Sequence, residues 1–330
     1  MRFVRLASAA VLLSLASLTA AYAEDSDRVG DLLRTVKKAR LIDLSSSWEN
    51  DSPVAGVNPP YHFRLRDTHA SSRGFFALFG ESPPGQLSFT AEVMDFSGQH
   101  GAPSIDAIGH IGRNGLLFGG VDAAQATSDP NGIGASGFGA HLGIDHYPLD
   151  LLVNRGVLLD VARMLAPKGN RAQPLPEKFE IVAKHLEDAA RRQGVTLKKG
   201  DTIFIRTGWG QYFNSNNALY AGGNSPGPGL DAAAFLIKHG ARVVGDDTLT
   251  FEQRPPKAVF NENGTQRVEI FPVHMKIIAD SGIFIIENLN LEELSEAKAY
   301  EFVVVVPPLL VKGGTGSALR AFALVPRDND

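Results

Sequence analysis

The sequence predicts a mixed α/β fold in a single domain. Segments with the spacing of strands alternate with segments with the spacing of helices along the chain, which is typical of α/β architectures. The chain has 330 residues, 44% of them hydrophobic, and it has neither an internal repeat nor a low-complexity linker. We therefore expect one large hydrophobic core within one domain.

The first 23 residues have the features of a secretory signal peptide. Two arginines open the segment, residues 6–18 are mostly apolar, and Ala-Tyr-Ala at 21–23 is a small-residue cleavage pattern. The apolar stretch is short for a membrane helix. We expect cleavage before Glu24, a single domain over residues 24–330, and a periplasmic or secreted protein.

Local spacing and turn residues predict the individual elements. The expected helices cover residues 31–40, 176–193, 231–239 and 273–279. The expected strands cover residues 41–44, 87–96, 156–161, 201–206, 242–244, 283–286 and 302–306, and the last of these should close the fold. Asn263-Gly264 between two β-prone runs predicts a hairpin. Residues 45–88 are rich in Pro, Gly and Ser and predict long loops that line a site.

Composition excludes several classes of function. The formal net charge is −4, and the Lys and Arg residues are scattered, so we expect neither nucleic acid nor an anionic membrane surface as a partner. The chain has no cysteine, which excludes disulfides and thiolate metal ligands. Any metal ion must therefore be held by His, Asp or Glu.

Residues 100–110 bring three groups with useful chemistry together: His100, Asp106 and His110. If the segment becomes helical after Pro103, with Ser104 as its cap, Asp106 and His110 project from one face. Two imidazoles and one carboxylate suit Zn or Mn, which can activate a bound water near neutral pH. The alternative is a capped helix with two surface histidines.

A second pair lies far along the chain. His274 begins the helix after the hairpin, and Glu287 ends the apolar strand over residues 283–286. A carboxylate buried at the end of such a strand needs a partner, because an unpaired buried charge costs several kcal/mol or more. The alternative places Glu287 at an exposed strand end.

These residues resemble the signature of the kynurenine formamidase-like cyclases, a metal-dependent family that includes isatin hydrolases. That signature is H-x-G-T-H-x-D-x-x-x-H, followed much later by a His and a Glu. His100, Asp106 and His110 match its first His, its Asp and its last His, while His274 and Glu287 match the distal pair. Supporting matches extend over nearly the whole mature chain, at residues 155–160, 200–209, 245–248, 287–292 and 312–317.

The resemblance implies a fold, a site and an activity. The fold is a swivelling β/β/α-like mixed sheet or barrel with surrounding helices. The implied metal ligands, to one or two divalent ions such as Zn or Mn, are His100, Asp106, His274 and Glu287. His110 is the implied general acid/base. The implied reaction is hydrolysis of a C–N bond in a small-molecule amide or cyclic amide, carried out by a homo-oligomer.

One position departs from the family pattern. The second His of the signature, normally a metal ligand, is Ser104 here. Three hypotheses follow: a single-metal site, a harder ion such as Mn or Mg that tolerates Ser104 or water, or a degenerate binding protein without catalysis. We place Ser104 in contact with the substrate in this interpretation.

Further patterns give competing interpretations. Trp209, after the strand over 201–206, could stack on an aromatic substrate or simply fill the core. Ser225 has the spacing of a nucleophile elbow, and Asp247 with His274 completes the chain order of a catalytic triad, although no strand precedes the serine. Residues 132–137 match a dinucleotide fingerprint, but they follow a turn rather than a strand, so we expect no nucleotide cofactor.

Overall fold

The structure is a computed structural model that describes residues 28–99, 101–167, 173–257 and 259–327. The chain divides into two compact units, Met1–Leu41 with Leu324–Asp330, and Ile42–Ala323. In the smaller unit, residues 28–38 are helical, which agrees with the helix predicted there. The predicted leader, residues 1–23, lies outside the described residues, and the domain limits at 24–330 stay a prediction.

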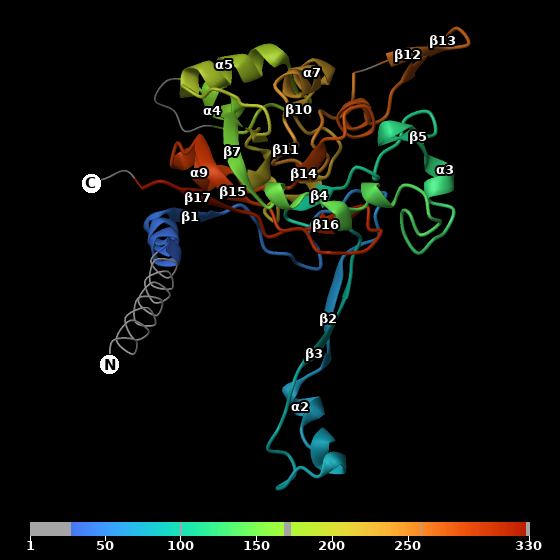
Figure 1. Cartoon of the computed structure of the whole chain (residues 1–330), viewed down its shortest axis with the longest axis vertical. Coiled ribbons are helices and arrows are strands. Elements are labelled where there is room, and N and C mark those ends of the chain that lie inside the picture. The colour runs from blue at the N-terminus through green and yellow to red at the C-terminus, as the bar shows by residue number, and fades with distance from the viewer. Residues whose placement is uncertain (1–27, 100, 168–172, 258, 328–330) are drawn as a thin grey trace, which may run out of the picture. The chain divides into compact units, whose positions relative to one another are not determined.

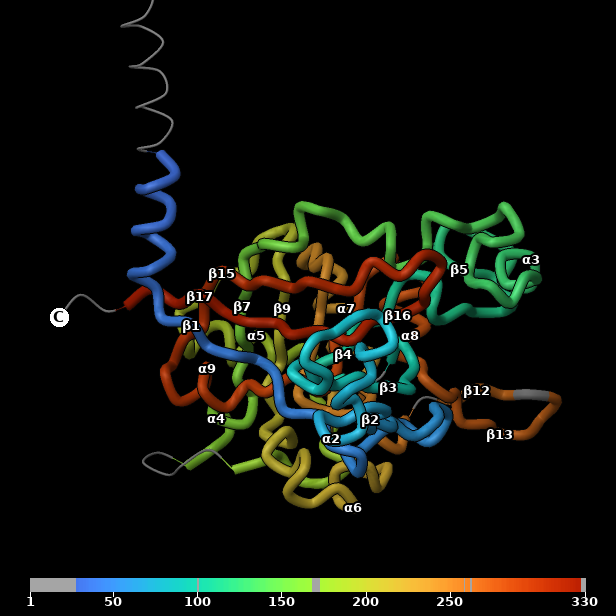
Figure 2. The backbone as a smooth tube through the Cα atoms, turned by 90° about the horizontal axis from the view of Figure 1, so that it is seen from below, coloured from blue at the N-terminus to red at the C-terminus, as the bar shows by residue number. Residues whose placement is uncertain are grey.

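The larger unit is built on a curled, mixed sheet, and the predicted α/β class is confirmed (Figures 1 and 2). Its strand order is β15-β7-β9-β11-β14-β4-β16, and the order continues beyond β15 with β17 and then β1. The bounds of these strands are β1 (Arg40–Asp43), β4 (Ser104–Asp106), β7 (Val153–Asp160), β9 (Thr202–Arg206), β11 (Val243–Asp246), β14 (Phe284–Glu287), β15 (Glu301–Val305), β16 (Gly316–Ala318) and β17 (Phe322–Val325).

Four neighbouring strands of this sheet run parallel, namely β7, β9, β11 and β14. β4 then pairs antiparallel with β14, and β16 pairs antiparallel with β4. Since the carboxyl ends of parallel strands meet at one edge of a sheet, the polar residues that end these strands gather there. Asp160, Arg206, Asp246 and Glu287 occupy that edge.

Helices cover one face of the sheet and close the core (Figure 1). They are α4 (Val161–Leu165), α5 (Ala183–Gln193) and α7 (Leu230–Lys238). Ile203 and Ile285 point from the sheet into the same buried cluster as Leu186 of α5 and Leu236 of α7. The buried sides of the helices and alternate residues of the strands therefore produce one continuous apolar layer.

Several predicted elements are confirmed and others are wrong. The Asn263-Gly264 hairpin is present as β12 (Val259–Glu262) and β13 (Thr265–Val268), with positive φ at both turn residues. The helix predicted from residue 176 begins only at Ala183. The helix predicted at 273–279 is α8 (Pro272–His274) followed by a π-helical turn, η7 (Met275–Ala279). The strand at 302–306 is not the last, because β16 and β17 follow it.

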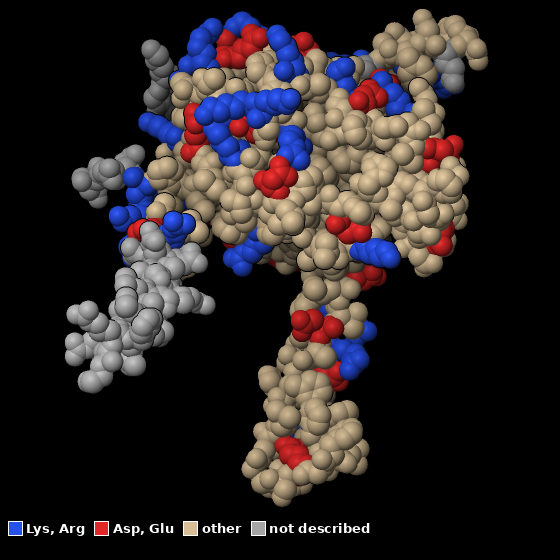
Figure 3. All heavy atoms as spheres, viewed as in Figure 1, with Lys and Arg blue, Asp and Glu red and all other residues tan. Residues whose placement is uncertain are grey.

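The region predicted as long loops contains an antiparallel ribbon of β2 (His62–Asp67) and β3 (Ala91–Asp95). The ribbon carries α2 (His69–Ser72) and the 3₁₀ turn η1 (Phe75–Phe79) at its end. Figure 3 shows few charges on this end, where Leu78 and Phe79 are exposed. Other short strands and α-helices are β5 (Leu116–Leu117), β6 (Val121–Asp122), α3 (Ala123–Ala126), β8 (Glu180–Ile181), α6 (Asn217–Tyr220), β10 (Gly227–Pro228) and α9 (Glu292–Glu296).

No helix within the described part of the chain has both the length and the apolar character needed to cross a membrane.

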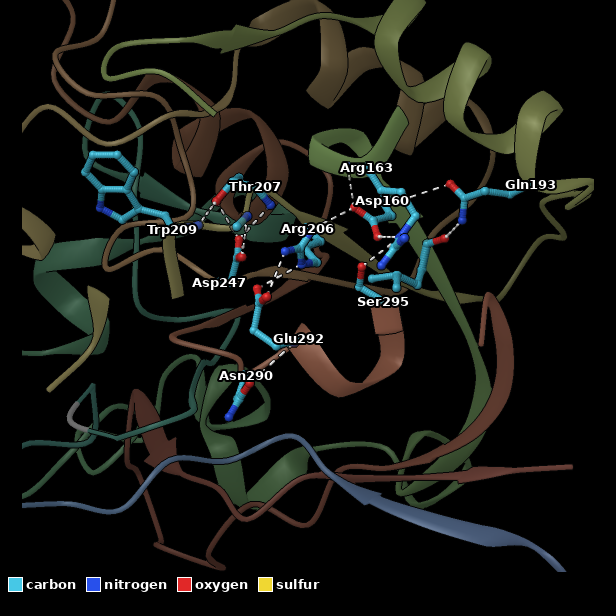
Figure 4. Close-up of polar contacts among 12 residues, drawn as sticks. Asp160, Arg163, Gln193, Arg206, Thr207, Trp209, Asp247, Asn290, Glu292 and Ser295 are labelled. Atoms are coloured by element: carbon cyan, nitrogen blue, oxygen red, sulfur yellow. Dashed lines mark hydrogen bonds and ion pairs between the residues drawn. The ribbon is translucent and has the colours of Figure 1, made fainter. Parts of the chain in front are cut away.

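A buried ion network joins β7, β9 and α9 (Figure 4). Arg206 donates from Nε and Nη2 to the two carboxylate oxygens of Glu292 at 2.9 and 2.8 Å, and from Nη1 to Asp160 at 3.0 Å. The next residue, Thr207, donates to Asp247 from its backbone N–H at 2.8 Å and from its hydroxyl at 2.6 Å. This network fixes the ends of β9 and β11 beside the polar edge of the sheet.

Replacing Arg206 should destabilise the fold strongly. Arg206→Met removes the cation 3.0 Å from the buried Asp160 carboxylate and leaves it only the longer ion pair with Arg163 at 3.4 Å; removal of one partner of a buried pair costs about 3–5 kcal/mol. The free energy of unfolding, measured by urea titration, should fall by that amount. The control is Arg320→Met, which removes an exposed ion pair with Asp43 and should cost at most about 1 kcal/mol. Equal losses in the two variants would contradict this view of the network.

Candidate metal centre

Three buried side chains from distant parts of the sequence meet at the polar edge of the sheet. Asp106 ends β4, Glu287 ends β14, and His274 ends α8. Their ligand atoms all lie within 4.8 Å of one another. His274 Nε2 is 3.2 Å from Glu287 Oε1 and 3.7 Å from Asp106 Oδ2. These are the groups that could hold a divalent cation between them.

Strand pairing explains why the two carboxylates face each other. β4 and β14 are antiparallel neighbours, with Asp106 opposite Ile285 and Ser104 opposite Glu287. Directly opposed residues, and residues two apart on one strand, point to the same face of a sheet. Ser104, Asp106 and Glu287 therefore share the face on which Ile285 joins the helix-covered core.

Glu252 holds His274 in place, and the sequence analysis did not identify it. The Glu252 carboxylate accepts the backbone N–H groups of Val273 at 3.3 Å and His274 at 3.1 Å, and it lies 2.6 Å from His274 Nδ1. Both Glu252 and His274 are buried. A carboxylate on one ring nitrogen fixes the tautomer and leaves the other nitrogen for a metal, which is the common arrangement for a ligating histidine. In the sequence, Glu252 is only an acidic residue next to Phe251, shortly after the strand predicted at 242–244.

The electrostatics of this cluster favour an added positive charge. Burial and the neighbouring Asp106 raise the pKa of Glu287 to about 7. Burial opposes the charged form of His274, but hydrogen bonds with Glu252 and Glu287 outweigh it and raise its pKa to about 10. Nearby, burial and Asp247 raise the pKa of Asp246 well above its usual value. Crowded carboxylates with raised pKa values are what a cation would relieve.

The Ser104 hydroxyl is an additional argument that a cation binds in this cluster. Its side chain is 1% exposed, and its hydroxyl has no hydrogen-bond partner in the described part of the protein. It points to the same face as Asp106 and Glu287, and a buried hydroxyl without a partner costs free energy. The two carboxylates, the imidazole and this hydroxyl together fit a hard or borderline divalent cation.

His110 lies at the rim of the cluster, although the helix predicted for this segment is wrong. Ser104 to Asp106 form β4 because they pair with β14 and β16, and a turn follows in which the His110 N–H donates to Ala107. His110 Nε2 is still 3.8 Å from Asp106 Oδ1, and the Gln99 amide nitrogen is 3.2 Å from Nδ1. The side chain is 28% exposed, so the ring borders both the cluster and solvent.

The remaining predicted site residues have different outcomes. His100 lies outside the described residues, so its role as a ligand stays a prediction. Trp209 does not fit substrate binding: it is 2% exposed, packs with Tyr220 and Leu249, and donates its indole N–H to the Tyr220 carbonyl. The core interpretation holds for this tryptophan, because a ring enclosed in this way has no face for a ligand.

The alternative serine triad is not assembled in the described residues. Asp247 accepts from Thr207 and from the Gly208 N–H, and His274 Nδ1 is engaged by Glu252. Neither residue makes a hydrogen bond with Ser225, which lies in a separate pocket. The geometry of the described residues therefore does not support the triad suggested by the spacing around Ser225.

The fold and the buried cluster define an α/β protein with a candidate cation site at the edge of a mixed sheet. The chain belongs to the putative cyclase family, whose sequence pattern matches residues 42–253. Isatin hydrolase from Roseibium aggregatum is 27% identical over 186 residues, which cover 51% of this chain and 63% of that enzyme. The match thus spans less than two thirds of the enzyme.

Solved structures agree with this family assignment. The crystal structure of a novel cyclase superposes with a TM-score of 0.70 at 26% identity, covering 90% of this chain and 92% of the other. Isatin hydrolase A from Labrenzia aggregata, bound to benzyl benzoate, superposes with a TM-score of 0.61 at 20% identity, covering 91% of this chain and 100% of the other. At that identity the second likeness establishes the fold alone.

Loss of the Glu252 carboxylate should weaken metal binding without removing any of the three grouped donors. Glu252→Gln leaves a neutral amide opposite His274 Nδ1, and changes to such supporting partners typically cost about 10–100-fold in affinity. A competition titration with a chromogenic chelator measures this. The matched control is Glu187→Gln on the exposed side of α5, which should leave the affinity unchanged. An unchanged affinity in Glu252→Gln would show that the carboxylate does not support the site.

Proposed function

We propose that this protein hydrolyses a C–N bond in a small-molecule amide or cyclic amide at a divalent cation held by Asp106, His274 and Glu287. The observation that carries the proposal is the meeting of these three buried donors within 4.8 Å, with His110 at their rim. Membership of the cyclase family and the similarity to an isatin hydrolase support it.

The donors favour Zn or Mn. They are an imidazole nitrogen and carboxylate oxygens, and the chain has no thiolate to offer. We propose His100 as a further ligand, which would bring the protein ligands to four. Ser104 stands where the family pattern has a ligand histidine, so we favour a single ion, or an ion that accepts a hydroxyl or water there, over the two ions of the formamidase pattern.

When bound, a divalent cation supplies Lewis acidity, which polarises an amide carbonyl and lowers the pKa of water. The protein's own residues orient the metal ligand and transfer protons. Glu252 accepts the Nδ1 proton of His274 and keeps Nε2 directed at the cluster. Gln99 contacts Nδ1 of His110 and directs Nε2 of that ring towards Asp106. We assign to His110 Nε2 the proton transfers from the attacking water and to the leaving nitrogen.

Ser104 also supports a second candidate, a binding protein of the same fold without catalysis. The serine occupies the place of a ligand histidine, and a neutral hydroxyl binds zinc poorly. Such a protein would bind the amide at the same cluster but not turn it over. Turnover by the metal-loaded protein separates the two candidates.

We further propose that the chain is exported through its leader and acts in the periplasm or outside the cell as a homo-oligomer. These proposals rest on residues 1–23 and on the family resemblance.

His110→Asn should strongly reduce turnover while metal is retained. An amide side chain keeps the approximate shape but cannot move a proton, and loss of a general acid/base lowers kcat by about 10²–10⁴-fold. Turnover of isatin and N-formylkynurenine, with metal content measured on the same samples, tests this.

Asp106→Ala should lose both metal and turnover. Glu187→Gln, on the exposed side of α5, is the control and should keep both. Loss of turnover in Ser225→Ala, together with wild-type activity that survives chelators, would favour a serine hydrolase.

Ser104→His should increase metal content. It restores the family's second histidine on the face shared by Asp106 and Glu287, so the site gains a nitrogen donor. Mass spectrometric metal analysis of the purified protein should show a higher metal-to-protein ratio than in the wild type, whereas Ser104→Ala should not raise it. A ratio unaffected by the histidine would mean that position 104 does not face the metal.

A further inference from the structure

A pocket lies next to the candidate metal centre, and residues of the loop that follows β11 line part of it. It encloses about 310 Å³, a size common for small-molecule sites. Its lining residues come from three separate stretches of the larger unit, at 55–57, 220–225 and 249–254, together with Ile270 and Phe271. Val57 and Ile270 are exposed at 85% and 60%, whereas Tyr220 and Ser225 are buried. The pocket therefore has an open, apolar mouth and a buried floor.

Arg254 makes this pocket positively charged. It is the one Lys, Arg, Asp, Glu or His among the described residues that line the pocket. The central carbon of its guanidinium lies over the Phe271 ring, 4.5 Å from the ring centroid, in a cation–π contact. The described residues form no ion pair with it within 4.0 Å.

Two polar atoms on this lining lack partners. Arg254 Nη1 and Thr250 Oγ1 are both buried, and neither has a hydrogen-bond partner in the described part of the chain. A guanidinium can only donate, so its missing partner must be an acceptor. A buried donor that carries charge is costly to leave unpaired, and a carboxylate satisfies it best because the two planar groups match.

The same aromatic ring joins this pocket to the metal centre. Phe271 packs edge-on against the His274 ring, with centroids 5.1 Å apart, while its face carries Arg254. Thr250 lies two residues before Glu252, the carboxylate that orients His274. A small molecule bound at Arg254 would therefore be separated from the candidate metal ligand His274 by the Phe271 ring.

We propose that this pocket is a distal part of the substrate site, in which Arg254 and Thr250 bind a carboxylate carried on an apolar body. This inference rests on the proposed function, since it assigns the pocket to the amide substrate. It narrows the substrate class to amides that carry a carboxylate away from the bond that is cleaved.

Equilibrium binding tests the pocket without any need for turnover. The probes are phenylacetate and its neutral isostere phenylacetamide, titrated calorimetrically into the wild type, Arg254→Met and Arg254→Lys. The wild type should bind phenylacetate about 10- to 100-fold more tightly than Arg254→Met does, the effect of one charge-assisted hydrogen-bonded pair. Arg254→Lys should fall in between, because it keeps the charge but loses the planar fork. Phenylacetamide should bind the wild type weakly and respond little to the substitutions.

The control is Arg66→Met, an exposed arginine on the β2–β3 ribbon, which should bind phenylacetate like the wild type. Thermal unfolding of each variant confirms that it is folded. Equal affinity of the wild type and Arg254→Met for phenylacetate, equal affinity of the wild type for the two probes, or no binding of phenylacetate at millimolar concentration would each overturn the proposal.

Turnover then separates this proposal from the proposed function. The matched substrates are 3-(2-formamidobenzoyl)propanoate, which carries a distal carboxylate, and 2-formamidopropiophenone, which lacks it. Arg254→Met should raise KM for the first by about 10- to 100-fold and leave the second unchanged. If neither amide is hydrolysed while phenylacetate still binds through Arg254, the hydrolase fails and the anion pocket stands. If both are hydrolysed and Arg254→Met changes neither KM, the pocket proposal fails alone.

Discussion

The structure depends on one electrostatic constraint: two carboxylates and an imidazole share a buried space at the edge of the central sheet. Asp106 and Glu287 approach each other because antiparallel β4 is paired directly with β14. Burial penalises the charge of Glu287, and the neighbouring Asp106 carboxylate makes Glu287 still harder to ionise, so the pKa of Glu287 is raised. A buried cluster of this composition is stable when a positive charge joins it, and a divalent cation provides more charge than a protonated histidine can.

The surrounding fold determines how that charge can be used. Glu252 fixes His274 from behind, and its contacts with two backbone N–H groups also hold the first turn of α8 in place. The network around Arg206 fixes the ends of β7 and β9 by separate contacts. The cluster is therefore held by the sheet on one side and by a helix end on the other, while His110 is the member that borders solvent. The Phe271 ring connects this centre to the pocket around Arg254, because it packs edge-on against His274 while Arg254 lies over its face.

Much of the fold was predictable because local spacing determined it. The buried strands over residues 201–206 and 283–286 and the Asn263-Gly264 hairpin have clear local signals, and each is present in the structure. Asp106 and Glu287 were identifiable because one lies in a dense cluster of polar groups and the other ends an apolar strand. Their proximity comes from pairing between strands that are far apart in sequence, which no local pattern encodes.

The wrong and missed predictions also come from contacts between segments that are far apart in sequence. The segment after Pro103 has helical spacing between Asp106 and His110, but β14 and β16 on either side hold it as a strand. Glu252 was missed because nothing near it in sequence shows that it faces His274. Trp209 fits either a core or a pocket, and only the packing of Tyr220 and Leu249 around it decides the matter. In each case a tertiary contact overrides or completes a local preference.

The most direct test of this account is an anomalous difference map from crystals of the protein, measured at the absorption edges of zinc and manganese. The account predicts one dominant peak within coordination distance of His274 Nε2, Asp106 and Glu287. A bound ion at another position, with these three side chains closing on one another in its absence, would contradict it.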